Sequence, residues 1–62
     1  MTQTPRPDPL AGALILLIED DTQIRRFLRT TLTSIGYRLL EATSGQDGLR
    51  QVSVQHPDLI IL

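Results

Sequence analysis

Residues 13–21 read ALILLIEDD, and the expected fold is built around them. Six apolar residues run without interruption into three acidic ones. A continuous apolar run of this length, entering a turn, is typical of a strand buried on both faces of a parallel sheet. Open α/β sheets bind their ligands at the carboxyl ends of such strands. The stretch therefore predicts a strand at residues 13–18, with Glu19 and Asp20 side by side at its carboxyl end.

A helix is expected next, at residues 22–35. Asp21 precedes it as a plausible N-cap, and Gly36 follows it at the C′ position. Its apolar residues recur at helical spacing and form one stripe: Ile24, Phe27, Leu28, Thr31, Leu32 and Ile35. Three arginines lie off this stripe: Arg25, Arg26 and Arg29. We interpret them as a solvated face rather than an anion site, because nothing in their spacing converges them.

The second half of the chain repeats this alternation. Residues 37–42 predict a second strand, residues 45–55 a second helix, and the run from Leu59 to Leu62 the opening of a third, buried strand. Right-handed crossovers between parallel strands are the rule in such units. We therefore expect an α/β domain of order βαβαβ with three parallel strands.

The second helix carries weaker signals than the first. Ser44 and Asp47 resemble a capping box at its start. Gly48 within it costs about 1 kcal/mol relative to Ala but permits a close approach to the sheet. The apolar face is thin and comprises Leu49, Val52 and Val54. His56 precedes Pro57, so extended backbone is expected there and should end the helix.

Composition limits the classes of function. A net charge of -1, with six Arg and no Lys among 62 residues, gives no electrostatic case for nucleic-acid binding by this segment. The chain has no Cys, which excludes disulfides and thiolate metal sites. The apolar run is shorter than the ~20 residues that span a bilayer, and its flanks do not suit a signal peptide. We expect a cytoplasmic protein that binds no membrane, with a disordered Pro-rich leader at residues 1–11 before a domain at residues 12–62.

The acidic pair supports two interpretations. Adjacent carboxylates at the end of a strand can hold a hard cation such as Mg²⁺, which takes oxygen ligands and keeps several waters. Alternatively, Glu19 and Asp20 only solvate the end of a buried strand while Asp21 caps a helix. Spacing alone favours this second interpretation, because three consecutive acids are a weak signal.

Longer blocks of sequence add a family resemblance. ILLIEDDTQIRRFLRTTL at residues 15–32, GYRLLEA at 36–42, SGQDGL at 44–49 and PDLIIL at 57–62 resemble, in order and spacing, the first half of a bacterial response-regulator receiver domain. Within the OmpR-like regulators, IRRFLRTTL and PDLIIL particularly resemble the Kdp type, which regulates a potassium-transport operon.

This resemblance implies a flavodoxin-like fold with strand order 2-1-3-4-5, of which the chain would hold 2-1-3. It implies a signalling protein rather than an enzyme, one that receives a phosphoryl group on an aspartate from a sensor histidine kinase, with Mg²⁺ as cofactor, and regulates transcription. Glu19 and Asp20 match the acidic pair that holds the metal, whereas Asp21 matches no ligand position.

In the family the phosphoacceptor aspartate directly follows the apolar run that ends here at Leu62. We therefore expect a truncated receiver that is not itself phosphorylated, binds Mg²⁺ weakly at most, and self-associates through its exposed sheet edge. A short module that pairs with an intact receiver and blocks it is the alternative. A nucleotide-binding fragment is disfavoured, because no G-x-G-x-x-G follows the first strand.

Overall fold

The computed structural model describes residues 11–62, so the predicted leader lies outside the described residues apart from Ala11. Five elements follow in the order β1 (Leu14–Ile18), α1 (Thr22–Ile35), β2 (Arg38–Ala42), α2 (Gly45–Gln55) and β3 (Leu59–Ile61). The predicted βαβαβ order is confirmed. Both helices have the predicted bounds, whereas β1 and β2 each begin one residue later than predicted.

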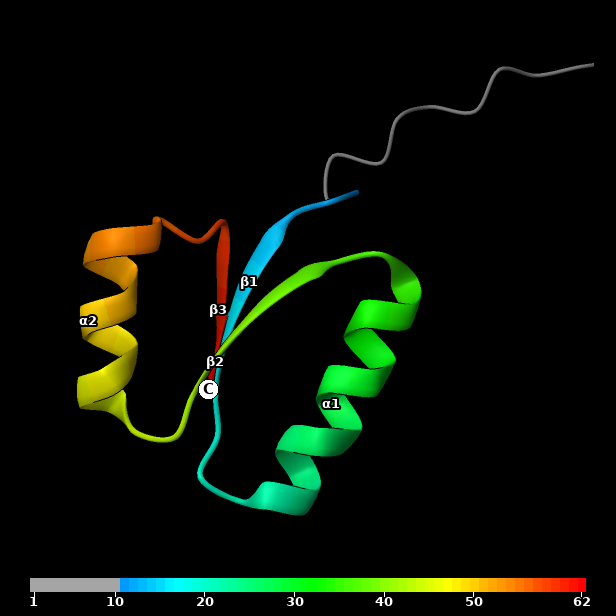
Figure 1. Ribbon diagram of the computed structural model, residues 1–62, viewed down its shortest axis with the longest axis horizontal. Helices are drawn as coiled ribbons and strands as arrows, with labels where there is room; N and C mark the ends of the chain where they lie inside the picture. The colour runs from blue at the N-terminus through cyan, green and yellow to red at the C-terminus, as the bar shows by residue number, and fades with distance from the viewer. Residues whose placement is uncertain (1–10) are drawn as a thin grey trace, which may run out of the picture.

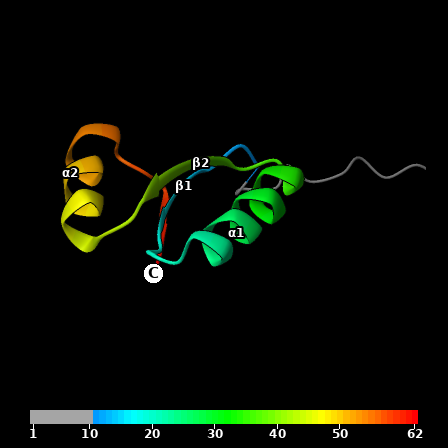
Figure 2. The ribbon, with the colours of Figure 1, turned by 60° about the horizontal axis from the view of Figure 1, so that its bottom comes forward.

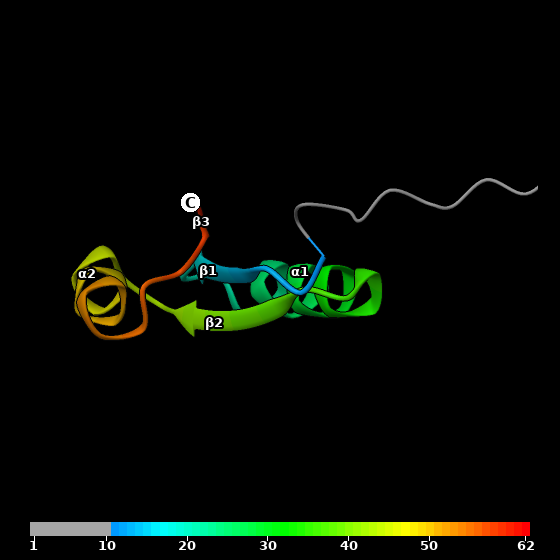
Figure 3. The ribbon, with the colours of Figure 1, turned by 90° about the horizontal axis from the view of Figure 1, so that it is seen from above.

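The three strands form one parallel sheet of order β2-β1-β3. β1 lies between its neighbours, and Leu17 is paired with Glu41 on one side and Ile61 on the other. Figure 3 shows β1 flanked by β2 and β3, and Figure 1 shows α1 and α2 on opposite faces of the sheet. Figure 2 shows the same layering from a third direction. The predicted strand order 2-1-3 is therefore confirmed.

The core is centred on β1. Ile15, Leu16 and Leu17 are 2%, 0% and 1% exposed. Since successive strand residues point to opposite faces of a sheet, three consecutive buried residues require cover on both faces. The two helices provide this cover, and the prediction of a strand buried on both faces is confirmed for β1.

Backbone caps define the ends of α1. The Asp21 side chain accepts a hydrogen bond from the Ile24 amide at 2.9 Å, as an N-cap should. Gly36 is in the left-handed conformation, with φ 115°, which suits glycine at C′. The next amide, of Tyr37, donates to the Leu32 carbonyl at 3.2 Å. Both predicted ends of α1 are therefore confirmed.

The ends of α2 agree with the predictions only in part. The Ser44 hydroxyl accepts from the Asp47 amide at 3.2 Å, but the Asp47 carboxylate accepts from the Arg50 side chain, so the capping box is half formed. The expectation of extended backbone at His56 is wrong, because its φ of 51° and ψ of 62° are left-handed. This conformation lets the His56 amide donate to Val52 while avoiding the right-handed region that a residue before proline disfavours.

The structure corrects the predicted apolar faces. α1 packs mainly against β2, and much of its stripe is exposed, including Phe27 at 68%. On α2 the predicted face is wrong at Leu49 and Val54, which are exposed. Gly48 is buried against β1 instead: a Cβ there would overlap Ile18 Cδ1 and lie 2.9 Å from Ile18 Cγ1, so the predicted close approach is confirmed.

The prediction that the third strand is buried is also wrong for this structure. Leu59 and Ile60 of β3 are both exposed. β3 pairs with β1 on one side, and within residues 11–62 no strand pairs with its other side. The strand therefore forms an apolar edge of the sheet.

Candidate functional site

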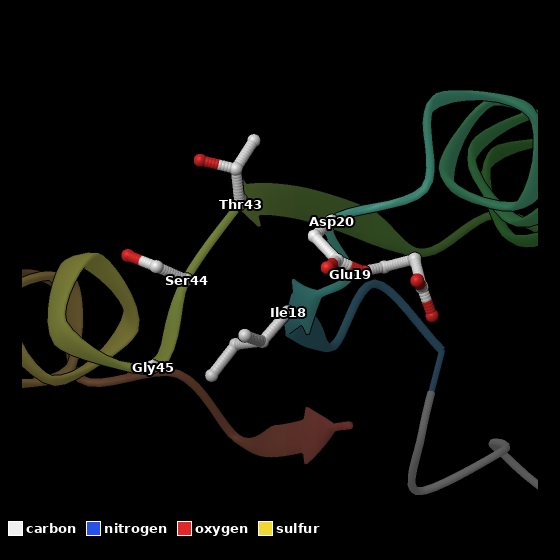
Figure 4. A pocket seen from close by; sticks show the side chains of 6 residues that line it. All are labelled: Ile18, Glu19, Asp20, Thr43, Ser44 and Gly45. Atoms are coloured by element: carbon white, nitrogen blue, oxygen red, sulfur yellow. The ribbon is translucent and has the colours of Figure 1, made fainter.

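The carboxyl ends of β1 and β2 lie at one edge of the sheet, where each strand turns into its helix. Figure 1 shows these two turns next to each other at the bottom of the view. A hollow open to solvent lies between them, and Figure 4 shows the residues that line it: Ile18, Glu19, Asp20, Thr43, Ser44 and Gly45. The structure therefore brings both sequence-predicted metal ligands to one hollow, which residues of the β2–α2 turn also line.

Glu19 is held by three hydrogen bonds. Its amide donates to the Ala42 carbonyl at 3.0 Å, which extends the β1–β2 pairing by one residue. Its carbonyl accepts from Arg25 Nη1 at 3.0 Å. Its carboxylate Oε2 accepts from the Asp21 amide at 3.0 Å. These contacts fix the position of Glu19 at the rim of the hollow and, as Figure 4 shows, its carboxylate points away from Thr43.

Asp20 is less constrained. Its side chain is exposed and makes no hydrogen bond or ion pair within residues 11–62. The carboxylate oxygens of Asp20, and Oε1 of Glu19, are therefore available to a ligand. No group of three or more His, Cys, Asp or Glu side chains in the described part of the chain could hold a metal ion. The donor set fits a hard cation that takes two carboxylates and completes its shell with water.

An ion-pair network lies beside the acidic pair, and the sequence did not reveal it. Arg29 Nε and Nη2 donate to Glu41 Oε2 and Oε1 at 2.8 and 2.9 Å. Arg25 Nε lies 3.4 Å from Glu41 Oε1. The prediction of a solvated arginine face is therefore wrong for Arg25, whose side chain is half-buried, whereas Arg26 and Arg29 are exposed as expected, and Arg29 also pairs with Glu41. Two features of the sequence could have indicated this network: a single acid within the second strand and two arginines one helical turn apart.

These contacts shift the ionisation of the network. The hydrogen bond from Arg29 lowers the pKa of Glu41, and partial burial of the carboxyl group opposes that shift. The same hydrogen bond raises the pKa of Arg29. Glu41 is consequently ionised over a wider pH range than an isolated glutamate, which preserves the link between β2 and α1.

Comparison with known proteins shows which family the sequence of this chain matches. Residues 15–62 match the family model described as "Response regulator receiver domain". The chain is 52% identical over 48 residues to the transcriptional regulatory protein AfsQ1 of Streptomyces coelicolor. It is 50% identical over 48 residues to the KDP operon transcriptional regulatory protein KdpE of Escherichia coli. Each alignment covers 77% of this chain and 21% of the relative.

A KdpE protein of Mycobacterium tuberculosis is also similar, with 43% identity over 49 residues, or 79% of this chain and 22% of the relative. The predicted resemblance to the Kdp type is therefore confirmed, and the chain is also similar to AfsQ1, a regulator that is not named KdpE. The chain spans about a fifth of the length of these relatives. Among residues 11–62, neither helix has the length and apolar character needed to cross a bilayer.

Proposed function

Because the chain belongs to the family of response regulator receiver domains, we propose that it forms the metal-holding part of a phosphorelay receiver. The observation that carries this proposal is the placement of Glu19 and Asp20 at the carboxyl end of the central strand, at the rim of an open hollow. In such a receiver a sensor histidine kinase supplies the phosphoryl group. The role of this chain is signal transduction rather than catalysis on a small-molecule substrate.

Receiver domains generally bind Mg²⁺, and the carboxylates of Glu19 and Asp20 would hold it here. When bound, the ion neutralises charge on the phosphoryl oxygens. Glu19 contributes a backbone held at both its amide and its carbonyl. Asp20 contributes an exposed carboxylate that has no partner of its own within the described residues. The neighbouring Ser44 hydroxyl already caps α2, so we assign no metal contact to it.

The phosphoacceptor and the output belong to a longer protein in this proposal. An aspartate directly after Leu62 would accept the phosphoryl group, and residues 1–62 alone would accept none. The similar proteins are transcriptional regulators by name, so we propose control of transcription, in the cytoplasm, as the output. DNA contacts would lie outside this segment, since its net charge of -1 offers little attraction to phosphates.

Phosphorylation of the intact protein that carries this sequence tests the proposal. Phosphorylated histidine kinase is added at a series of Mg²⁺ concentrations, and acid-labile phosphate on the receiver is measured. Glu19→Gln or Asp20→Asn should raise the Mg²⁺ requirement by at least ~10-fold, the scale of losses seen around metal sites. Asp47→Asn, which removes an acid from α2, is the matched control. An unchanged Mg²⁺ requirement in both site variants would contradict the proposal.

A second candidate function is an interaction module that pairs with an intact receiver and blocks it. Its support is the exposed apolar surface: Phe27 on α1, Leu49 on α2 and the β3 edge. The same exposed apolar residues would also favour self-association through the β3 edge. A pull-down with a full receiver tests pairing, and sedimentation of residues 1–62 at several concentrations tests self-association. A monodisperse monomer that captures no receiver would reject this candidate.

A further inference from the structure

We propose that Arg25 is a positioning residue for the acidic pair: it holds the peptide group between Glu19 and Asp20 in place, and Glu41 orients its guanidinium. This inference rests on the proposed function, because it assumes that the pair binds a divalent cation. The juxtaposition involves three elements, since Arg25 comes from α1, Glu41 from β2 and Glu19 from the end of β1.

The geometry gives Arg25 two partners at once. Nη1 donates to the Glu19 carbonyl at 3.0 Å, and Nε lies 3.4 Å from Glu41 Oε1. The Arg25 side chain is only 16% exposed, compared with 46% for Arg29. A guanidinium has a planar set of donors, so contacts on two of its nitrogens fix its orientation. Arg29 in turn binds both Glu41 oxygens and thereby holds the carboxylate that orients Arg25.

The orientation of the Glu19 carbonyl affects how the two proposed ligands lie relative to each other. It belongs to the planar peptide group that joins the two proposed ligands, so its rotation would move Asp20 relative to Glu19. The other side of Glu19 is already held, because its amide donates to Ala42. Without Arg25, no described residue would hydrogen bond to this carbonyl. The peptide group could then rotate, and the Asp20 carboxylate would shift relative to Glu19.

Charge alone makes the opposite prediction. A guanidinium repels a divalent cation, so removal of its charge should strengthen Mg²⁺ binding if Arg25 acted only through space. A positioning role instead requires that the loss of Arg25 weakens binding. The sign of the change in affinity therefore separates the two explanations.

The test compares Arg25→Gln with Arg26→Gln in the intact protein that carries this sequence. Both variants remove one positive charge from neighbouring positions of α1, but Arg26 is exposed and its side chain makes no hydrogen bond or ion pair within the described residues. We expect Arg25→Gln to weaken Mg²⁺ affinity about 10-fold by calorimetry, the scale of losses for residues that support metal ligands. Arg26→Gln should leave the affinity unchanged or slightly stronger.

A second measurement makes the test independent of the metal. The ¹³C shift of the Glu19 carbonyl, recorded without Mg²⁺, should move upfield in Arg25→Gln and stay unchanged in Arg26→Gln. If Arg25→Gln does not fold, Arg25→Lys replaces it, because lysine keeps the charge but lacks the planar pair of donors. The same upfield shift and weaker binding are then expected.

The outcomes separate this inference from the proposed function. A wild-type protein that does not bind Mg²⁺ refutes the proposed metal site, and this inference fails with it. A wild-type protein that binds Mg²⁺, with Arg25→Gln equal or tighter in affinity, overturns the positioning role alone. Weaker binding with the expected carbonyl shift supports both.

Discussion

The same substitution at two leucines gives a direct test of the packing. Leu16 in β1 is fully buried, whereas Leu49 in α2 is 73% exposed although the apolar pattern placed it on the inner face of its helix. Leu16→Ala removes three buried carbons, worth about 2.4 kcal/mol at roughly 0.8 kcal/mol each. A residual cavity raises the expected loss in the free energy of unfolding to about 2–5 kcal/mol. Leu49→Ala should change it by less than about 0.5 kcal/mol.

The assay is urea unfolding followed by far-UV circular dichroism. A domain of this size is expected to have a total stability of only about 3–9 kcal/mol, so Leu16→Ala could leave little folded protein. Ile15→Val is the milder probe of the same strand, with an expected loss of about 0.5–1.5 kcal/mol. Each variant is measured at two protein concentrations, because association could cover Leu49. Equal losses for Leu16→Ala and Leu49→Ala at both concentrations would refute the packing described here.

Three further predictions concern the caps and the ion-pair network. Asp21→Ala should lower the free energy of unfolding by about 1 kcal/mol through loss of the α1 N-cap, and Asp20→Ala, without such a bond, serves as its control in the same urea assay. His56→Gly should raise the stability by about 0.5–1 kcal/mol, since glycine adopts the left-handed conformation without strain; no gain in the urea midpoint would contradict this assignment. The pKa of Glu41 is lowered by folding, so its contribution to stability is present above the unfolded pKa and is lost as the pH falls through the lower folded pKa. Glu41→Gln should therefore make the free energy of unfolding fall less steeply below about pH 4.5, as measured by urea unfolding across an acidic pH series. The same pH dependence in the variant and the wild type would count against the Arg29–Glu41 link.

Local patterns along the chain were enough to predict the elements and their order. The uninterrupted apolar run of β1 and the turn residues Asp21, Gly36 and Ser44 act within a few positions along the chain, so their effects are readable locally. Parallel strands joined by helices then require crossovers, which leaves few topologies. The placement of Glu19 and Asp20 at the sheet edge follows from the same reasoning.

Contacts between side chains of different elements depend on how the elements pack in the fold, so local sequence patterns did not predict them. Arg29 and Glu41 are 12 residues apart, and they pair because the register of β2 against β1 brings this part of β2 under α1. The same packing buries Gly48 rather than Leu49, since the closest approach of α2 to β1 admits no side chain there. An apolar stripe on a helix is buried only where a neighbouring surface covers it. The extent of that surface is a property of the folded sheet.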